Sequence, residues 1–171
     1  MFEGPDGSGK TTVMNKVADR LRDETDYNII VTKEPGEKIS DTNKNIRQSL
    51  LDHQPSTYTE LMLFLADRAE HVEKFIRPKL KEDNNIIISD RYWESTIVYQ
   101  SFYRNTIEYK QLKQLHSLVT NDMYPDKTYI LNSNKSHSKS KKDNMERTTR
   151  RKQIVVLYNK LNDLKLNYDL F

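Results

Sequence analysis

The feature that most constrains this chain is a glycine-rich segment at residues 4–11, which reads GPDGSGKT. It fits the pattern G-x-x-x-x-G-K-[ST], and a helical pattern of apolar residues follows it at once. In such a loop the glycines let backbone N–H groups point at phosphate oxygens, and the helix that follows adds the positive end of its dipole. We therefore expect a loop that binds the phosphates of ATP, formed by Gly4, Pro5, Asp6, Gly7, Ser8, Gly9, Lys10, Thr11 and Thr12.

Two residues of this loop have predicted roles in chemistry. Lys10 would place a point charge at the β- and γ-phosphates, and the Thr11 hydroxyl would bind Mg²⁺. Asp6 is unusual in a phosphate loop, because a carboxylate repels phosphate. It either forms the turn, for which aspartate is suited, or faces away toward a second substrate.

The rest of the sequence alternates between helical and strand patterns. Helices are predicted at 10–24, 42–52, 57–81, 94–103 and 106–120, and in a last segment that carries Ile154, Leu157, Leu161 and Leu164. Strands are predicted at 28–33, 86–88 and 128–131. This alternation predicts an α/β fold of three layers, with a parallel central sheet flanked by helices. The run Ile86–Ile88 is expected to be fully buried.

Composition limits the function classes. The chain has 171 residues, which indicates one domain, and its formal charge is only +3. It has no cysteine, which excludes disulfides and thiolate zinc sites, and no apolar run long enough to span a membrane. We expect a cytoplasmic protein without membrane or nucleic-acid partners.

An acidic residue follows the buried strand. Asp90 is placed to hold Mg²⁺ or its waters opposite Thr11, and the adjacent Arg91 can bind phosphate with two hydrogen bonds. The alternative is that Asp90 caps the N-terminus of the next helix. The preceding phosphate loop favours the magnesium site.

The helix predicted at 57–81 carries a possible base-binding pair. Arg68 lies beside its apolar stripe, one turn after Phe64, where an arginine is unfavourable unless it is paired or faces a cleft. Phe64 could stack on a base while Arg68 hydrogen-bonds its edge. Taken alone, the two residues favour the alternative, in which Phe64 packs in the core and Arg68 forms a surface salt bridge.

Residues 127–152 carry nine basic and two acidic side chains. Within them, the Lys- and Ser-rich residues 133–144 are too polar to pack. We expect a mobile lid at about 133–151 that closes over triphosphate; a solvated loop or a nucleic-acid contact would have the same composition. The four histidines show no metal-ligand spacing, and most are expected at the surface.

Taken together, several segments resemble the thymidylate kinase family. They read FEGPDGSGKTT at 2–12, TKEPG at 32–36, FLADR at 64–68, DRYWESTIVYQ at 90–100 and YPDKT at 124–128. The resemblance covers residues 1–132 and implies transfer of the γ-phosphoryl group of ATP to dTMP with Mg²⁺. It also implies a homodimer. A deoxynucleoside monophosphate kinase of broader specificity and a catalytically weak nucleotide-binding protein are the alternatives.

The resemblance implies a role for each site residue. It gives dTMP binding to Asp6, Glu34, Pro35, Arg47, Phe64, Arg68, Arg91, Ser95, Thr96, Tyr99 and Gln100. It places Glu34 near Mg²⁺ together with Thr11 and Asp90. The catalytic residues would be Lys10, Asp6, Arg91 and an arginine of the lid.

Some family members carry a catalytic arginine inside the phosphate loop, where this chain has Gly7. Such sequences resemble the bacterial type, whose lid supplies the arginine. Arg147, Arg150 and Arg151 are the candidates. Compared with the family, we expect a single domain over 1–171 with a shortened first strand and a C-terminal end without the closing strand and helix.

Overall fold

The computed structural model describes residues 1–36, 39–132, 145–161 and 168–170. Its strands are β1 (Phe2–Glu3), β2 (Asn28–Lys33), β3 (Asn85–Asp90), β4 (Thr128–Ile130) and β5 (Tyr168–Leu170). Its helices are α1 (Lys10–Glu24), α2 (Asp41–Asp52), α3 (Thr57–His71), η1 (Val72–Ile76), α4 (Arg77–Leu80), α5 (Trp93–Thr96), η2 (Ile97–Tyr103), α6 (Tyr109–Thr120) and α7 (Met145–Lys160).

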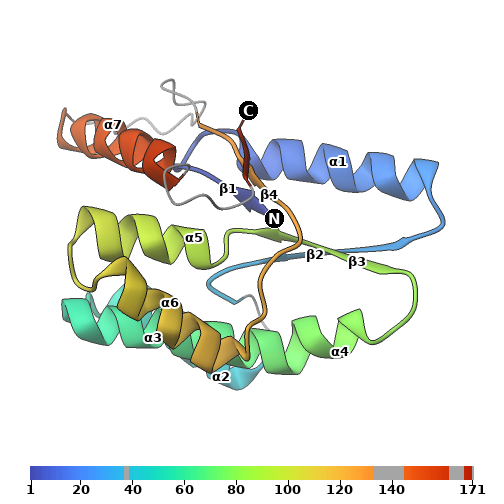
Figure 1. Cartoon of the computed structure of the whole chain (residues 1–171), viewed down its shortest axis with the longest axis horizontal. Coiled ribbons are helices and arrows are strands. Elements are labelled where there is room, and N and C mark those ends of the chain that lie inside the picture. Colours follow the sequence, from blue (N-terminus) through green and yellow to red (C-terminus); the bar gives the residue numbers. More distant parts are fainter. Residues whose placement is uncertain (37–38, 133–144, 162–167, 171) are drawn as a thin grey trace.

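The five strands form one parallel sheet in the order β2-β3-β1-β4-β5. The short β1 lies in the middle of the sheet, where Phe2 is opposite Asp90 on one side and Tyr129 on the other. All carboxyl ends of the strands point to the same edge (Figure 1). The phosphate loop after β1 and Arg91 after β3 therefore meet there, which is the usual position of a ligand site in such sheets.

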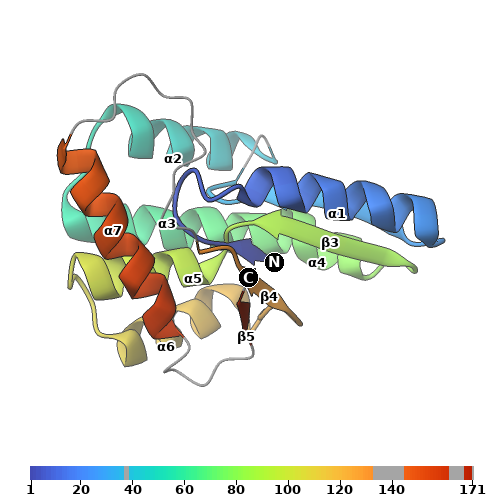
Figure 2. The same ribbon diagram turned by 90° about the horizontal axis from the view of Figure 1, so that it is seen from above.

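Helices cover both faces of the sheet, as predicted (Figure 1). On one face α1 contributes Met14 and Ala18 to a buried cluster with Phe2, Ile88 and Leu131. A second cluster, formed by Leu61, Leu65, Val72, Tyr92, Trp93 and Ile97 among others, lies among the remaining helices. Because α7 packs against η2 and adds Ile154 and Tyr158 to this cluster, it lies beside the helices that follow β3 (Figure 2).

Two predicted helices contain wider turns of the π type. The predicted helix at 57–81 is continuous, but it changes to a π-helix at η1 before it ends with α4. The predicted helix at 94–103 begins with one α-turn and continues as η2. Such turns are frequent at functional sites, and apolar spacing along the sequence does not reveal them.

Three expectations about burial and length are wrong. Ile86 and Ile87 are only half-buried, because Phe2 is the only residue of β1 with a register partner on β3 and a cavity of about 430 Å³ lies beside them. His71 and His116 are fully buried rather than at the surface. The closing strand is present, since residues 168–170 pair in parallel with β4. The strand β1 has two residues.

Among the described residues, no helix is long and apolar enough to cross a membrane.

Candidate active site

The phosphate loop leads from β1 into α1 with backbone that suits glycine. Gly4 has a φ of 140°, and a Cβ there would overlap the carbonyl oxygen of Leu131. Gly9 is the N-cap of α1 with a φ of 92°. The loop closes through a hydrogen bond of 3.2 Å from the Ser8 N–H to the Pro5 carbonyl oxygen. The N-terminus of α1 therefore opens onto the loop, as anion binding requires.

Lys10 lies inside this loop. Its Nζ donates to the Pro5 carbonyl oxygen at 3.1 Å, and only 6% of the residue is exposed. Burial and then the positive charge of Arg91 lower the pKa of Lys10 to about 8. A bound anion would offset both effects, so this ammonium group is well suited to pair with phosphate.

Thr11 and Asp90 are brought together as predicted. The Thr11 hydroxyl donates to Asp90 Oδ2 at 2.7 Å from the first turn of α1. Asp90 is not a helix cap, because the N-cap of α5 is Tyr92. That alternative is therefore wrong. Thr12 lies beside Thr11 in the same turn and is exposed.

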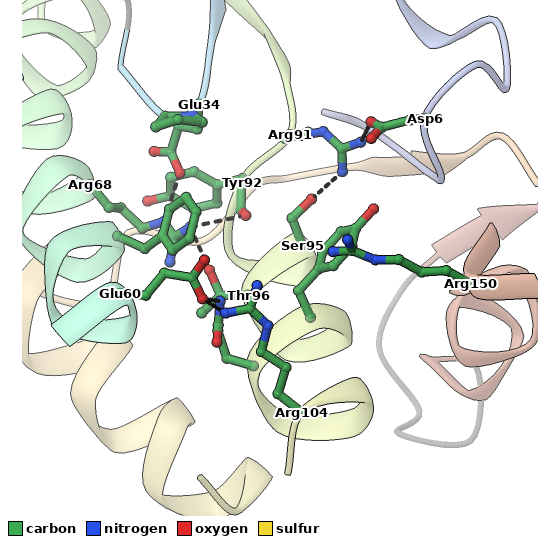
Figure 3. A pocket seen from close by; sticks show the side chains of 14 residues that line it. Asp6, Glu34, Glu60, Arg68, Arg91, Tyr92, Ser95, Thr96, Arg104 and Arg150 are labelled. Carbon is green, nitrogen blue, oxygen red and sulfur yellow. Dashed lines mark hydrogen bonds and ion pairs between the residues drawn. The ribbon is translucent and has the colours of Figure 1, made fainter. Parts of the chain in front are cut away.

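A cavity of about 240 Å³ opens beside the phosphate loop (Figure 3). Eleven of its lining residues are predicted site residues: Asp6, Glu34, Pro35, Phe64, Arg68, Arg91, Ser95, Thr96, Tyr99, Gln100 and Arg150. Arg47 is outside this lining, and its Nη1 donates to the Pro35 carbonyl oxygen at 3.1 Å. The prediction missed three lining residues, Glu60, Tyr92 and Arg104. Glu60 and Arg104 lie outside the motifs quoted above, and Tyr92 lies within the segment 90–100 without having been assigned a role.

Arg68 is buried in the wall of the cavity rather than forming a surface salt bridge. Its Nε donates to Glu34 Oε2 at 2.8 Å, and its Nη2 donates to Thr96 Oγ1 at 2.9 Å. Its Nη1 is buried and has no hydrogen-bond partner among the described residues. Phe64 is half-buried and lines the cavity, so it is not simply a core residue.

The predicted metal role of Glu34 does not fit its surroundings. One carboxylate oxygen accepts from Arg68, and the other lies 3.1 Å from His71 Nδ1. The described residues contain no group of three or more histidine, aspartate or glutamate side chains that could hold a metal. Both oxygens of Glu34 are thus engaged by Arg68 and His71, although its backbone N–H donates to the Asp90 carbonyl oxygen at 3.0 Å.

Arg91 lies between the phosphate loop and the cavity (Figure 3). Its Nη2 is 2.6 Å from Asp6 Oδ1, and its Nη1 donates to Ser95 Oγ at 2.8 Å and to Tyr158 Oη at 3.1 Å. The guanidinium also lies over the Tyr99 ring, 5.7 Å from its centre. These contacts fix the orientation of Arg91.

Glu3 supports this arrangement and was missed. Its carboxylate is fully buried and accepts hydrogen bonds from the Ser95 hydroxyl at 2.8 Å and the Tyr158 hydroxyl at 3.0 Å. It also accepts from the Tyr92 N–H at 2.7 Å. Glu3 therefore holds two of the groups that hold Arg91. In the sequence, the feature that could have indicated this role is an acidic residue within the short strand before the loop.

The lid arginines differ in position. Arg150 lines the cavity with its guanidinium 5.5 Å from the centre of the Tyr103 ring. Arg151 donates to the carbonyl oxygen of Asp6 in the phosphate loop. The side chain of Arg147 and residues 133–144 of the predicted lid lie outside the described part of the chain.

Comparison with known proteins gives one consistent result. The thymidylate kinase family model matches residues 2–165. Thymidylate kinases of Staphylococcus haemolyticus and Staphylococcus epidermidis are each 42% identical to this chain over 131 residues, which cover 76% of this chain and 62% of theirs. The chain thus matches less than two thirds of the length of these relatives.

A solved structure agrees in fold. The thymidylate kinase from Ehrlichia chaffeensis superposes with a TM-score of 0.76 at 32% identity, covering 99% of this chain and 89% of that one.

Proposed function

Because this chain belongs to the thymidylate kinase family, we propose that it transfers the γ-phosphoryl group of ATP to dTMP, which yields ADP and dTDP. The observation that carries the proposal is the contact between Asp6 and Arg91. It joins a phosphate loop to a cavity that contains an aromatic side chain and the buried Arg68. Such an arrangement suits a nucleotide donor and a nucleotide acceptor held end to end.

On the donor side, the loop amides and Lys10 would bind the phosphates of ATP. The oxygen atoms of Thr11 and Asp90 are of the kind that Mg²⁺ prefers, and their separation of 2.7 Å brings them to one point at the loop. These two residues would hold the ion, which when bound would neutralise phosphate charge.

On the acceptor side, Arg91 would bind the phosphate of dTMP. Phe64 would offer a ring face to the base, while the unpaired Nη1 of Arg68 would donate to the base edge. Tyr99 lies beside Arg91 and would contact the sugar. Asp6 would orient Arg91 and meet the sugar side of the nucleotide.

The transfer needs little acid or base chemistry from the protein. An ionised phosphate oxygen of dTMP attacks the γ-phosphorus; the bond from that phosphorus to the β–γ bridging oxygen breaks, and ADP leaves with its electron pair. A phosphate monoester is largely ionised at neutral pH, so no proton must be removed first. Lys10, Arg91 and Arg151 would act by positioning and by stabilising charge.

The expected homodimer and the cytoplasmic location stay predictions. The lid at about 133–151 likewise stays a proposal, supported on its described side by the contact of Arg151 with the phosphate loop.

The first experiment measures ADP release from Mg·ATP by purified 1–171. The acceptors are dTMP, dUMP, dCMP, dGMP and none. Lys10→Ala should abolish turnover, while Lys16→Ala is the matched control, because Lys16 is an exposed lysine of the same helix. Turnover led by dTMP and lost in Lys10→Ala supports the proposal. Equal use of all acceptors indicates a broader kinase, and nucleotide binding without turnover indicates a binding protein; either result overturns it.

A further inference from the structure

The orientation of one amide in the cavity is determined by its neighbour. Gln100 is 1% exposed and lines the cavity, and its Nε2 donates to Glu60 Oε2 at 3.0 Å. A carboxylate accepts hydrogen bonds and has none to donate. The amide must therefore turn its NH₂ group to Glu60, which leaves Oε1 on the other side. That oxygen is buried and has no hydrogen-bond partner among the described residues.

Glu60 is itself held by a charge. Arg104, which directly follows η2, forms an ion pair with the same Oε2 atom that accepts from Gln100. Both side chains line the cavity (Figure 3). The side chain of Glu60 is 15% exposed. The guanidinium favours the ionised carboxylate and hence the form that can only accept. Arg104, Glu60 and Gln100 thus form a chain of contacts from the rim of the cavity to its wall.

The cavity wall therefore offers two unsatisfied atoms of fixed polarity. Arg68 Nη1 can only donate, and Gln100 Oε1 can only accept. Unpaired buried polar atoms are costly, so a ligand that satisfies both is favoured. A thymine ring presents an acceptor at O4 next to a donor at N3–H. A cytosine ring presents the reverse, a donor at N4 next to an acceptor at N3.

We propose that the Arg104–Glu60 ion pair is a positioning pair, which locks the Gln100 amide with its oxygen toward the acceptor base and so selects bases that carry N3–H. The inference rests on the proposed function, because it assumes a pyrimidine nucleotide in this cavity. With its phosphate on Arg91, as proposed above, the nucleotide would direct its base toward Arg68 and Gln100, which line the same cavity. In this proposal Glu60 and Arg104 act on base selection through the Gln100 amide.

The test compares dTMP with 5-methyl-dCMP. The two nucleotides share the methyl group and differ only at positions 3 and 4 of the ring. The ratio of their kcat/KM values therefore measures how well the protein distinguishes these two positions. Glu60→Gln keeps the size of residue 60 but supplies a group that can donate or accept. Gln100 can then turn over. We expect the preference for dTMP to fall by about 10-fold or more, through slower use of dTMP and faster use of 5-methyl-dCMP.

Two further variants serve as a control and as an independent test. Glu73→Gln is the matched control, because Glu73 forms an ion pair with Arg77 at 3.0 Å on the same run of helix but outside the cavity lining. It should leave the ratio unchanged. Arg104→Gln leaves Glu60 intact but removes the ion pair that holds its carboxylate against Gln100, so it should lower the ratio in the same direction. If circular dichroism shows that Glu60→Gln does not fold, Arg104→Gln alone tests the proposal.

The outcomes separate the two proposals. If the wild-type protein uses neither nucleotide, the proposed function fails. If the wild type prefers dTMP and the variants keep that preference, the proposed kinase function is supported. The positioning role of the Arg104–Glu60 pair is then overturned. An equal fall of kcat/KM for both nucleotides would show a merely structural role of the pair and would also overturn the proposal. Calorimetric titration of both nucleotides without ATP should show the same change of ratio in binding.

Discussion

The Asp6 carboxylate lies 2.6 Å from the Arg91 guanidinium, although the two residues are 85 positions apart in the sequence. Asp6 belongs to the phosphate loop, and Arg91 directly follows β3 and lines the cavity. The contact ties the donor side of the site to the acceptor side. A change at Arg91 should therefore affect the two nucleotides differently.

Replacing Arg91 by alanine should weaken the use of dTMP more than the binding of ATP. The substitution removes a charged partner of the acceptor phosphate, and charged hydrogen bonds contribute about 1.5–3 kcal/mol each. We expect kcat/KM for dTMP to fall by at least about 10-fold, while the Kd of ATP changes only a few-fold. Steady-state kinetics and calorimetric titration of ATP measure the two quantities.

Arg20→Ala is the control, because Arg20 is an exposed arginine of α1 in an i, i+4 pair with Glu24. It should leave both quantities unchanged. An equal loss of dTMP use and ATP binding in Arg91→Ala would contradict the role assigned to Arg91.

The two lid arginines whose side chains are described should have different kinetic effects. Arg151 contacts the carbonyl oxygen of Asp6 in the loop, whereas Arg150 lines the acceptor cavity over Tyr103. We expect Arg151→Ala to lower kcat by about 10- to 100-fold, because it removes charge close to the transferred group. Arg150→Ala should chiefly raise KM for dTMP. The reverse pattern would exchange their roles.

Much of the site followed from local sequence. The phosphate loop has a fixed spacing, and Asp90 follows a strand pattern, so the meeting of Thr11 with Asp90 could be predicted from topology. The resemblance to a family added most of the cavity lining. These features depend on residues that are close in sequence or on the rule that parallel strands end at one edge.

Other features depend on long-range contacts, which a single sequence does not reveal. Glu34 was expected near the metal, but its carboxylate forms an ion pair with Arg68, which lies 34 positions later in the sequence. Glu3 looked like part of a strand, yet it holds Ser95 and Tyr158. The strand at 168–170 is defined only by its pairing with β4. In each case a partner brought close by folding decides the role.

Affinity for ATP should depend on the protonation of Lys10. Burial lowers the pKa of this side chain to about 8, and only the ammonium form attracts phosphate. We expect the Kd of ATP to be constant below about pH 7 and to rise as the pH passes through 8. Isothermal titration between pH 6.5 and 9.5 measures it. Lys10→Arg should flatten this dependence, because arginine stays charged, and an unchanged profile in that variant would contradict the assignment.

The stability of the fold should fall as the pH rises, because of Glu94. This side chain is 1% exposed, and burial and then the nearby Glu3 raise its pKa from 4.5 to about 8. Its Oε1 accepts from Thr128, whereas its Oε2 has no partner among the described residues. The folded protein therefore keeps a proton on Glu94 at pH values where the unfolded chain has lost it.

The sign follows from proton linkage. The stability that protonated Glu94 contributes is fully present below about pH 4.5 and is lost as the pH rises toward 8. Over this range the slope is at most about 1.4 kcal/mol per pH unit in the free energy of unfolding.

Glu94→Gln imitates the protonated acid and should flatten the slope, so that this variant is more stable than the wild type at pH 8. Urea unfolding at pH 5, 6, 7 and 8 measures the slope, with the exposed Glu24→Gln as the control. Equal slopes for Glu94→Gln and the wild type would show that Glu94 is already ionised in the folded protein, and would contradict the prediction.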